Sequence, residues 1–488
     1  MAEANWEDVL RNLLGQENAD QMMAAMRQAG LDPAQMGAAL GGFNEVQLRA
    51  MMEQTKRLLA QPAGINWELA RDTARHVVHQ GGDPAVMAAQ DAHFRQAMQV
   101  ADLWLDVVTD LAPAGMERKV WARAQWVEST IAVWREVMEP VALSAVDALA
   151  QALAEQASAQ GVDLSGADAG LEGLAGFNGF DGLDALMAQM DPTGAATGPT
   201  SGPGLGTMLH RMAGLVFATQ MGQAVGQLAQ EVLGAGDSGL PLTVGTAALV
   251  PTNVSAFMDS LEVPADEVLA FLATREAATA RLYAGVPWLK GHVLSLLGQY
   301  AREIRLDTEA IEEALRGVDV SDQAALQQAL TGGMFSPRQS AAQERALEEL
   351  QTLLAVIEGW VEEVTASAVA PHLPHAVALR ESMRRRRAVG GPAEHLFASL
   401  VGLQLRPRRA RDAAELWANV ARERGVAERD ALWGHPDLIP SGADLDSPST
   451  FVQLREMEAQ ESAAMDDELA RLLDGSLPQD DAARDADA

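Results

Sequence analysis

The sequence contains no cysteine, which excludes disulfides, thiolate metal sites and cysteine nucleophiles. Aromatic residues are scarce, at 5%, and there is no run of about 18 uninterrupted apolar residues that could span a membrane. The opening stretch, MAEANWEDVL, lacks the basic and then apolar segments of a signal peptide. We therefore expect a cytoplasmic protein.

Basic side chains are in short supply, because 36 Lys and Arg stand against 68 Asp and Glu, a net charge of -32. The negative excess repels nucleic-acid phosphates and anionic lipids, so neither is an expected partner. The abundant residues, Ala, Leu, Glu and Gln, favour helices, and the 48% hydrophobic residues suffice for a sizeable core. Composition therefore predicts a mainly α protein, and a length of 488 residues predicts more than one lobe.

Changes in composition divide the chain into regions. One stretch is rich in Gly, Ala and Thr without periodicity, which is typical of a flexible linker. The end of the chain is acidic and poor in apolar side chains, which is typical of a disordered tail. The expected regions are a helical, partly flexible region at 1–60, a helical lobe at 61–160, a Gly-rich linker at 161–205, a helical domain at 206–455 with short strands at 240–257, and a mostly disordered tail at 456–488.

Three residues make local predictions. Pro140 is expected to separate two helices, because proline lacks the backbone N–H that a helix interior needs. Gly222 and Gly226 give the helix expected at about 205–234 a face of small residues. Polar side chains interrupt this segment, which favours close packing between soluble helices over a membrane dimer.

The segment 264–284 has the pattern of a helix. Pro264 suits the first turn, acidic residues follow it, and Gly285 is suited to the end. One stripe of this helix is apolar except for Arg275 and Thr279. A buried arginine is costly without a partner, so Arg275 must find one.

The residues 275–279 read Arg-Glu-Ala-Ala-Thr and are followed by RLYAGVPWL, residues 281–289. This stretch resembles an actinobacterial family of zincin-like, zinc-dependent metallopeptidases, some of them catalogued only provisionally as hydrolases. The resemblance covers most of residues 60–450. The other segments that carry it are NWELARDTAR (66–75), ADLWLD (101–106), GTAALVPTNV (245–254), LLAVIEGWVEEV (353–364), SMRRRRAVGGPAEHLFASLVGLQLRPRR (382–409) and ALWGHPDLIP (431–440).

The resemblance implies a zincin-like helical fold with a small β-sheet or hairpin beside the motif helix, and a hydrolase ancestry with zinc as the ancestral cofactor. An edge strand within GTAALVP would accept an extended peptide. In an HExxH helix, two histidines four residues apart bind zinc and the intervening glutamate activates water. Glu276 matches the general-base position, and Glu358 matches the third ligand.

Arg275 and Thr279 stand where the two histidines would be. Arginine has no lone pair for a metal, and a threonine hydroxyl is a poor zinc ligand. We therefore expect no zinc or other cofactor, a vestigial general base at Glu276, and an ion pair from Arg275 to Glu358 or, as second choice, to Glu276.

Histidines elsewhere could supply other ligands, but their contexts favour structural or exposed roles. His372 and His375 flank a proline, which argues against one regular helix carrying both. The same interpretation applies to His292, His395 and His435.

The only strongly basic region of the chain lies near residues 384–411. It could bind phosphate, RNA or an acidic partner, but it lacks interleaved aromatics and any RNA-binding motif. Internal pairing with glutamates or with the acidic tail is the alternative. The candidate binding residues are Arg384, Arg385, Arg386, Arg387, Arg408 and Arg409.

Two function classes remain open from the sequence. One is a hydrolase of the metallopeptidase family, acting on peptide bonds. The other is a non-catalytic descendant that binds a protein or peptide partner, or serves as a scaffold, through the old cleft or the arginine cluster. The lost histidines favour the second class for present activity and the first for ancestry.

Overall fold

The computed structural model describes residues 65–113, 117–159, 205–243, 245–302, 340–388 and 409–473, together with 390, 394 and 396. The expected regions at 1–60 and 161–204 and the last residues of the chain, 474–488, lie outside this description.

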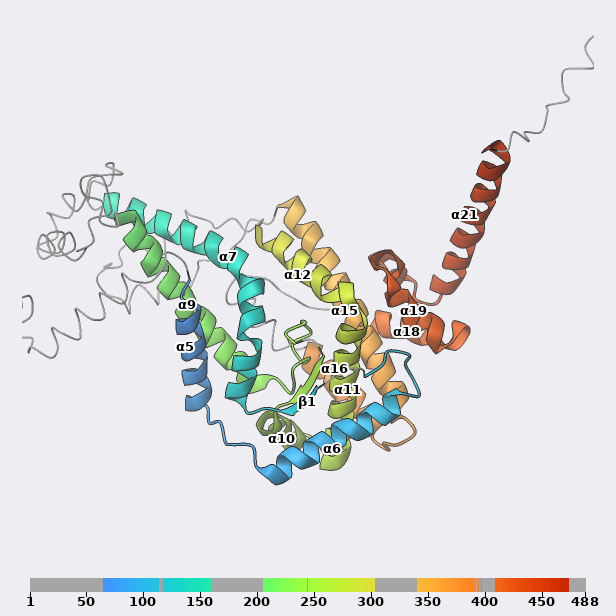
Figure 1. The fold of residues 1–488 in the computed structure, drawn as a ribbon, viewed down its shortest axis with the longest axis horizontal. Helices are drawn as coiled ribbons and strands as arrows, with labels where there is room; N and C mark the ends of the chain where they lie inside the picture. Colours follow the sequence, from blue (N-terminus) through green and yellow to red (C-terminus); the bar gives the residue numbers. More distant parts are fainter. Residues whose placement is uncertain are drawn as a thin grey trace, which may run out of the picture.

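The fold is mainly α, as the composition predicts (Figure 1). None of the helices in the described part of the chain is long and apolar enough to cross a bilayer. The helices are α5 (Trp67–Gln80), α6 (Ala88–Leu105), α7 (Arg123–Ala159), α9 (Leu205–Glu231), α10 (Pro251–Asp259), α11 (Ala265–Gly285), α12 (Pro287–Arg302), α15 (Ala341–Val369), α16 (Ala376–Ala388), α18 (Ala410–Arg424), α19 (Val426–Ala431), α20 (Gly442–Asp446) and α21 (Phe451–Leu473).

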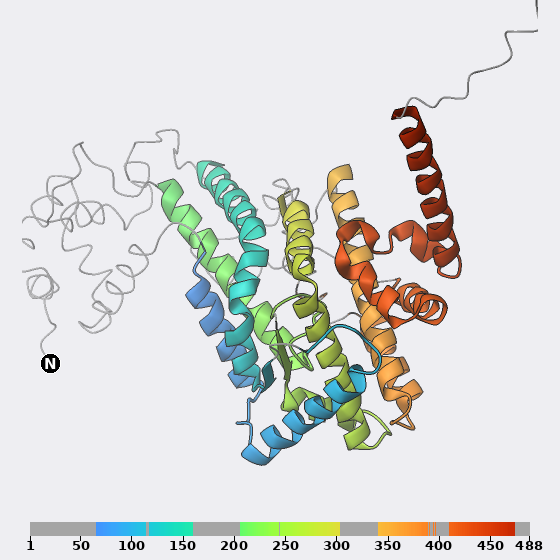
Figure 2. The ribbon, with the colours of Figure 1, turned by 45° about the vertical axis from the view of Figure 1, so that its right-hand side comes forward.

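The helices form neighbouring groups around one continuous core. In two views, α5, α7 and α9 lie side by side, α11, α12 and α15 form the middle of the molecule, and α6 crosses below them (Figures 1 and 2). Buried side chains from all of these helices belong to a single hydrophobic cluster, which includes Trp126, Trp134 and Trp360. The core therefore contains side chains both from helices before residue 160 and from helices after residue 204.

The small sheet pairs two distant segments. Strand β1 (Glu117–Val120) runs parallel to β2 (Thr246–Leu249), with Glu117 opposite Thr246. A parallel pair cannot be a hairpin, because its strands need a crossover connection. The expected small sheet beside the motif helix is thus present, and β2 lies within the expected 240–257 segment.

Both edges of β2 are occupied by the chain itself. On the side away from β1, Gly234 forms an antiparallel bridge with Leu249. The N–H of Ala235 donates to the carbonyl of Ala248 at 2.9 Å, and the N–H of Val250 donates to Leu233 at 2.9 Å. The expectation that this strand offers an open edge to an extended peptide is therefore wrong.

The motif helix α11 begins and ends within one residue of the expected 264–284. Pro264 is its N-cap, Asp266 and Glu267 lie in its first turn, and Gly285 is its last residue. Acidic side chains in the first turn stabilise a helix through its dipole. The local sequence thus determines both ends of the helix that carries the motif.

Pro140 does not separate two helices, contrary to the sequence prediction. It lies inside α7, which bends along its length (Figure 1). Proline in a helix interior costs about 3 kcal/mol. Here Trp134 and Met138 before the proline and Ala142 after it are fully buried, so packing on both sides offsets that cost.

The small-residue face of α9 packs closely against α5, as expected. A Cβ added at Gly222 would come within 2.4 Å of the Ala70 carbonyl oxygen, and one at Gly226 within 2.7 Å of Val77 Cβ. Only glycine permits this approach, so the two helices are held together by backbone contact along these positions.

Helix α21 extends away from the rest of the described structure (Figures 1 and 2). It occupies residues that composition assigns to the tail beginning at 456. Its sequence is rich in Ala, Glu, Met and Leu, which favour helix even where little is buried. Phe451 and Val452 at its start are buried, and they fix the helix to the body.

Candidate functional site

The three motif positions on α11 all face the interior. Arg275, Glu276 and Thr279 are each less than 9% exposed. The helix is buried without interruption from Phe271 to Tyr283, because other elements surround it. Charged groups in such a position need partners within the protein.

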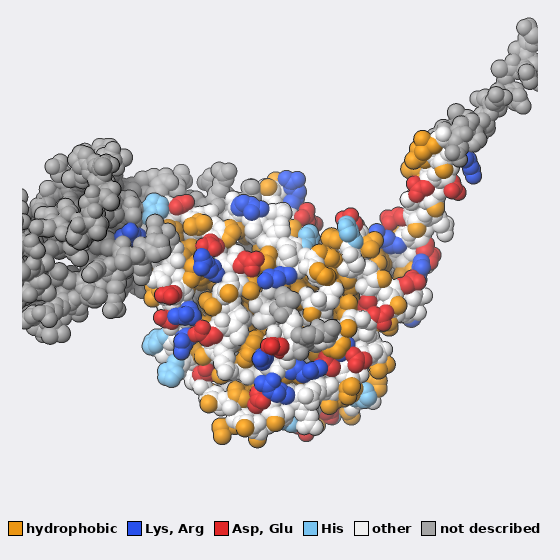
Figure 3. All heavy atoms as spheres, viewed as in Figure 1, with side chains coloured by type: hydrophobic (Ala, Val, Ile, Leu, Met, Phe, Trp, Pro, Cys, Tyr) orange, Lys and Arg blue, Asp and Glu red, His pale blue; other side chains and the backbone are white. Residues whose placement is uncertain are grey.

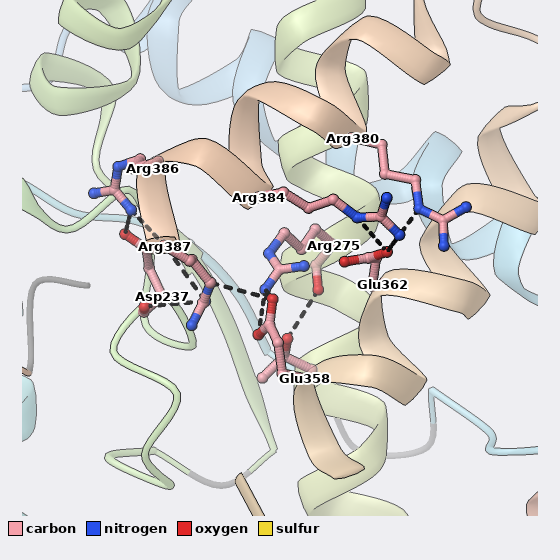
Figure 4. A network of polar contacts seen from close by, with 9 residues as sticks. Asp237, Arg275, Glu358, Glu362, Arg380, Arg384, Arg386 and Arg387 are labelled. Atoms are coloured by element: carbon pink, nitrogen blue, oxygen red, sulfur yellow. Dashed lines mark hydrogen bonds and ion pairs between the residues drawn. The ribbon is translucent and has the colours of Figure 1, made fainter. Parts of the chain in front are cut away.

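Arg275 pairs with Glu358 of α15 (Figure 4). Its Nη2 atom donates to Oε1 at 2.5 Å and to Oε2 at 2.6 Å. Burial alone would lower the pKa of Arg275, but the surrounding carboxylates, with Glu358 first and then Asp237 and Glu362, together raise it. The partner predicted first from the sequence is therefore confirmed.

A second guanidinium reaches the same carboxylate. Arg387, near the end of α16, places Nε 3.2 Å from Oε1 of Glu358. Burial and the neighbouring charge of Arg275 lower the pKa of Arg387, although Glu358 opposes that change. Glu358 thus has positively charged neighbours from both α11 and α16.

Asp237, from the segment between α9 and β2, balances the arginines of α16 (Figure 4). Its Oδ2 lies 3.0 Å from Arg386 Nη1 and accepts the N–H of Leu233 at 2.9 Å. Its Oδ1 lies 3.8 Å from Arg387 Nη2. Burial by itself would raise the pKa of Asp237, but the charges of Arg386 and Arg387, the hydrogen bond from Leu233 and the charge of Arg275 hold it below its usual value.

Glu276 is bonded to the backbone instead of to a side chain. Its carboxyl oxygens accept the N–H of Gly236 at 3.0 and 3.2 Å and the N–H of Ala248 at 3.1 Å. Burial raises the pKa of Glu276 to about 7, although these hydrogen bonds favour the charged form. The second choice of partner for Arg275 therefore has a different structural role.

Thr279 completes the face of α11. Its hydroxyl donates to the carbonyl of Arg275 at 3.0 Å, one turn earlier in the same helix. A cavity of about 20 Å³ lies among Arg275, Glu276, Thr279 and Asp237. That volume can hold a single water molecule and nothing larger.

The residues at this site do not fit a zinc ion. Arg275 brings a positive charge to the site, and the hydroxyl of Thr279 is bonded to the helix backbone. Both oxygens of Glu358 are bonded to Arg275. A zinc site needs three protein ligands with free lone pairs. Among the residues that the structure describes, no group of three or more His, Cys, Asp or Glu is arranged to hold a metal.

The other candidate histidines are dispersed and have local contacts. His372 stacks on Trp104 with ring centroids 4.4 Å apart, and His375 pairs with Glu267 at 3.0 Å. His435 caps the short helix after it by accepting the N–H of Asp437, and His292 lies against Trp288. The expected structural roles hold for these four, and His395 lies outside the described residues.

The arginine cluster is largely used inside the protein. Arg384 donates to Glu362 at 2.5 and 2.9 Å, and Arg409 donates to Asp446 at 2.6 Å. Arg386 and Arg387 form ion pairs with Asp237. Among the four consecutive arginines of α16, residues 384–387, only Arg385 has a mostly exposed side chain, at 72%. Arg408 lies outside the described residues.

Surface charge gives no separate basic patch on the face of Figure 3. Lys and Arg side chains alternate there with Asp and Glu side chains. Such a mixture does not create a strong electrostatic field of one sign, which would be needed to attract a charged ligand. The internal-pairing alternative therefore accounts for most of the arginine cluster.

Two features of the site could not be recognised from the motif. Asp237 lies in a glycine-rich turn without a sequence signal of its own. Arg281, fully buried on α11, donates to the Asp102 carbonyl at 2.9 Å and to its carboxylate at 3.0 Å. Arg281 follows Arg275 by six positions on the same buried helix. Its burial requires a partner of opposite charge, and this requirement is the sequence signal that points to a second ion pair.

Several of the segments that carried the family resemblance meet at α11 and at the start of α12. Four of them, 101–106, 245–254, 353–364 and 431–440, contribute a hydrogen-bond partner to the motif helix or to the turn after it. These pairs are Arg275 with Glu358, Arg281 with Asp102, Glu276 with Ala248, and Trp288 with Trp433.

The chain belongs to the zincin-like metallopeptidase family, whose model matches residues 65–452. Its fold is similar to that of a solved protein from Chloroflexus aurantiacus, which is provisionally described as a hydrolase with a novel fold. That similarity has a TM-score of 0.50 at 16% sequence identity and covers 80% of this chain and 99% of the other. No functionally curated protein matches the sequence.

Proposed function

We propose that this chain is a non-catalytic member of the zincin-like metallopeptidase family, in which an arginine–carboxylate network replaces the metal. The observation that carries the proposal is the buried contact of Arg275 Nη2 with both oxygens of Glu358. The resemblance aligns these two residues with the first and third ligand positions, and their contact leaves neither side chain free to bind a metal.

The remaining general-base position supports the same conclusion. In a zincin, the glutamate acts on a water that the metal binds and acidifies. Here the carboxyl group of Glu276 is bonded to the N–H groups of Gly236 and Ala248. The adjoining cavity of about 20 Å³ has no room for a peptide bond beside that carboxyl.

A scaffold or binding role is the function class that remains. The network ties α11, α15, α16 and the segment after α9 into one unit through charge-assisted hydrogen bonds. A protein or peptide partner would not use the old cleft, since side chains and backbone of the chain itself fill it. The exposed surface, which includes Arg385, is where such a partner would bind.

Restoring the ligands tests the proposal. We expect Arg275→His with Thr279→His to bind zinc weakly, because Arg387 still lies 3.2 Å from Glu358. Adding Arg387→Gln should free that carboxylate and strengthen binding. Zinc should then raise Tm in the order wild type (no rise), double variant, triple variant, since a ligand stabilises the state that binds it.

A matched control removes the same positive charge as Arg387→Gln does, but at a residue that does not contact Glu358. Arg385→Gln in the double variant removes an exposed arginine two positions from Arg387, and it should not improve the zinc response. A zinc-dependent rise in the wild-type Tm would contradict the replacement of the metal. So would equal responses from all the variants, provided that circular dichroism shows them to be folded.

A further inference from the structure

Helix α6 lies at the edge of the described structure and carries an uncharged stripe on its outer side (Figures 1 and 2). Its inner side buries Phe94, Met98 and Leu105 in the core. At about 100° per residue, six exposed residues on the side away from the core fall within an arc of about 100°. They are Ala88, Ala92, Gln96, Gln99, Leu103 and Val107.

The apolar members of the stripe are open to solvent. Leu103 is 66% exposed and Val107 is 82% exposed. Val107 follows the end of α6, but the N–H of Thr109 donates to the carbonyl of Leu105 at 3.1 Å, so the helical turn continues through it. Met87, directly before α6, is 69% exposed. Large apolar side chains are therefore exposed at both ends of the helix.

The charged side chains that border the stripe are paired within the chain. Arg95 Nε lies 2.7 Å from Asp91 Oδ2, and Asp106 Oδ1 lies 2.8 Å from Arg281 Nη2. These pairs leave the stripe without an unpaired charge at its border. On a chain with a net charge of -32, such a face is where another acidic molecule meets the least repulsion.

The order of residues along the stripe is self-complementary. Small side chains occupy its first half and large apolar ones its second half. An antiparallel pair of α6 helices, with a two-fold axis between positions 97 and 98, sets Ala88 of one copy opposite Val107 of the other. The same axis sets Ala92 opposite Leu103. Each large side chain thus meets a small one, as close helix packing requires.

The same axis brings the two glutamines of the stripe together. Gln96 of one copy lies opposite Gln99 of the other, and the pair occurs twice because the axis relates the copies. A glutamine side chain both donates and accepts hydrogen bonds, so each pair can satisfy itself across the contact. A polar pair at the centre of an otherwise apolar seam also selects one register.

We propose that two copies of this chain form an antiparallel dimer through the outer stripe of α6. The contact uses the same surface on both copies, so it closes at two chains. It is independent of the motif helix and of its metal content. A contact between two single helices is small, below the roughly 1,200 Å² of standard interfaces, so we expect a reversible dimer with a Kd on the order of 10 μM.

Sedimentation equilibrium of the full chain, from about 1 to 200 μM, tests the dimer first. Raising the salt concentration should strengthen it, because screening weakens the repulsion between two acidic chains. An association that depends on ion pairs would respond in the opposite way. A chain that stays monomeric at the highest concentration, or a dimer that salt weakens, would overturn the proposal.

Two variants test the register of the contact. Ala92→Glu and Leu103→Lys should each weaken dimerisation about ten-fold or more, because each places a charge against an apolar side chain twice per dimer. An equimolar mixture of the two variants should dimerise more tightly than either alone. In the mixed dimer the introduced glutamate meets the introduced lysine, and the second contact keeps Ala92 opposite Leu103.

Matched controls place the same substitutions on another exposed helix. Ala463→Glu and Leu469→Lys change exposed residues of α21, and both should dimerise as the wild type does. Circular dichroism should show that all four variants are folded. Dimerisation that the α6 variants leave unchanged, or that the α21 variants abolish, would overturn the proposal. So would a mixture that associates no more tightly than its separate components.

Discussion

The Nη2 atom of Arg275 lies between the two carboxyl oxygens of Glu358, 2.5 Å from one and 2.6 Å from the other. The two residues are 83 positions apart and come from α11 and α15. Their contact joins the two most deeply buried helices of the site. It is formed at positions where the family motif would place a metal ligand on each helix.

Removing Arg275 and removing the charge of Glu358 should lower the free energy of unfolding by different amounts. Arg275→Met leaves Glu358 with Arg387, whereas Glu358→Gln removes the charge that both arginines contact. Breaking a buried ion pair typically costs about 3–5 kcal/mol, so Glu358→Gln should fall in that range and Arg275→Met below it.

Urea denaturation at pH 7 measures both variants. Asp446→Asn serves as control, since its pair with Arg409 is exposed and should contribute less than about 1 kcal/mol. Equal losses from Arg275→Met and Glu358→Gln, or losses as small as that of the control, would show that the network is not organised around Glu358.

Glu276 should give the protein a particular pH dependence. Burial raises its pKa from 4.5 to about 7, so the folded state holds a proton that the unfolded state releases between these values. The contribution of this group to stability is therefore present below pH 4.5 and is lost as the pH rises through 7. Glu276→Gln removes the titration but keeps an oxygen that can accept a hydrogen bond.

We expect the stability of Glu276→Gln, relative to wild type, to increase by on the order of 3 kcal/mol between pH 4.5 and pH 8. Denaturation curves at several pH values measure this difference. Parallel stability profiles for the two proteins would mean that Glu276 titrates at its ordinary pKa, and so is not held in a dry site.

The sequence determines the local parts of this structure well. The bounds of α11 follow from Pro264, the acidic first turn and Gly285, which act within a few residues of one another. The pairing of Arg275 with Glu358 follows from a motif and from the cost of burying an arginine alone. Both predictions depend on short-range chemistry or on a resemblance that already contains tertiary information.

The parts that sequence reasoning did not find depend on contacts between distant segments. Strand β1 has no alternating pattern of its own, and it pairs with β2 only because the helices between them fold back. Asp237 becomes important because α16 brings Arg386 and Arg387 to it from about 150 residues away. Pro140 stays in a helix because packing on both sides outweighs a local preference.

The close contact of α15 with α18 gives a prediction about packing next to the site. A Cβ added at Gly359 would be 2.5 Å from Ala413 Cβ and 2.6 Å from the Ala414 nitrogen. Because backbone is involved, the helices must separate, and we expect Gly359→Ala to destabilise the protein by about 1–3 kcal/mol.

The control is the same substitution in open space. Gly291→Ala in α12 adds a methyl group that meets nothing within 4 Å, so it should stabilise the helix by up to about 1 kcal/mol. Thermal and urea denaturation of both variants give the comparison. A neutral Gly359→Ala would indicate that α15 and α18 are not packed as closely as the structure shows.

Zinc content tests the central claim most directly. The purified, tag-free protein should be incubated with excess zinc, freed of unbound metal by gel filtration, and measured by elemental analysis. Because Arg275 and Thr279 supply no metal ligand and Glu358 is bonded to Arg275, we predict far less than one zinc per chain. A content near one equivalent that is lost in Glu276→Gln or Glu358→Gln would contradict the account, because it would show that these residues still hold a metal.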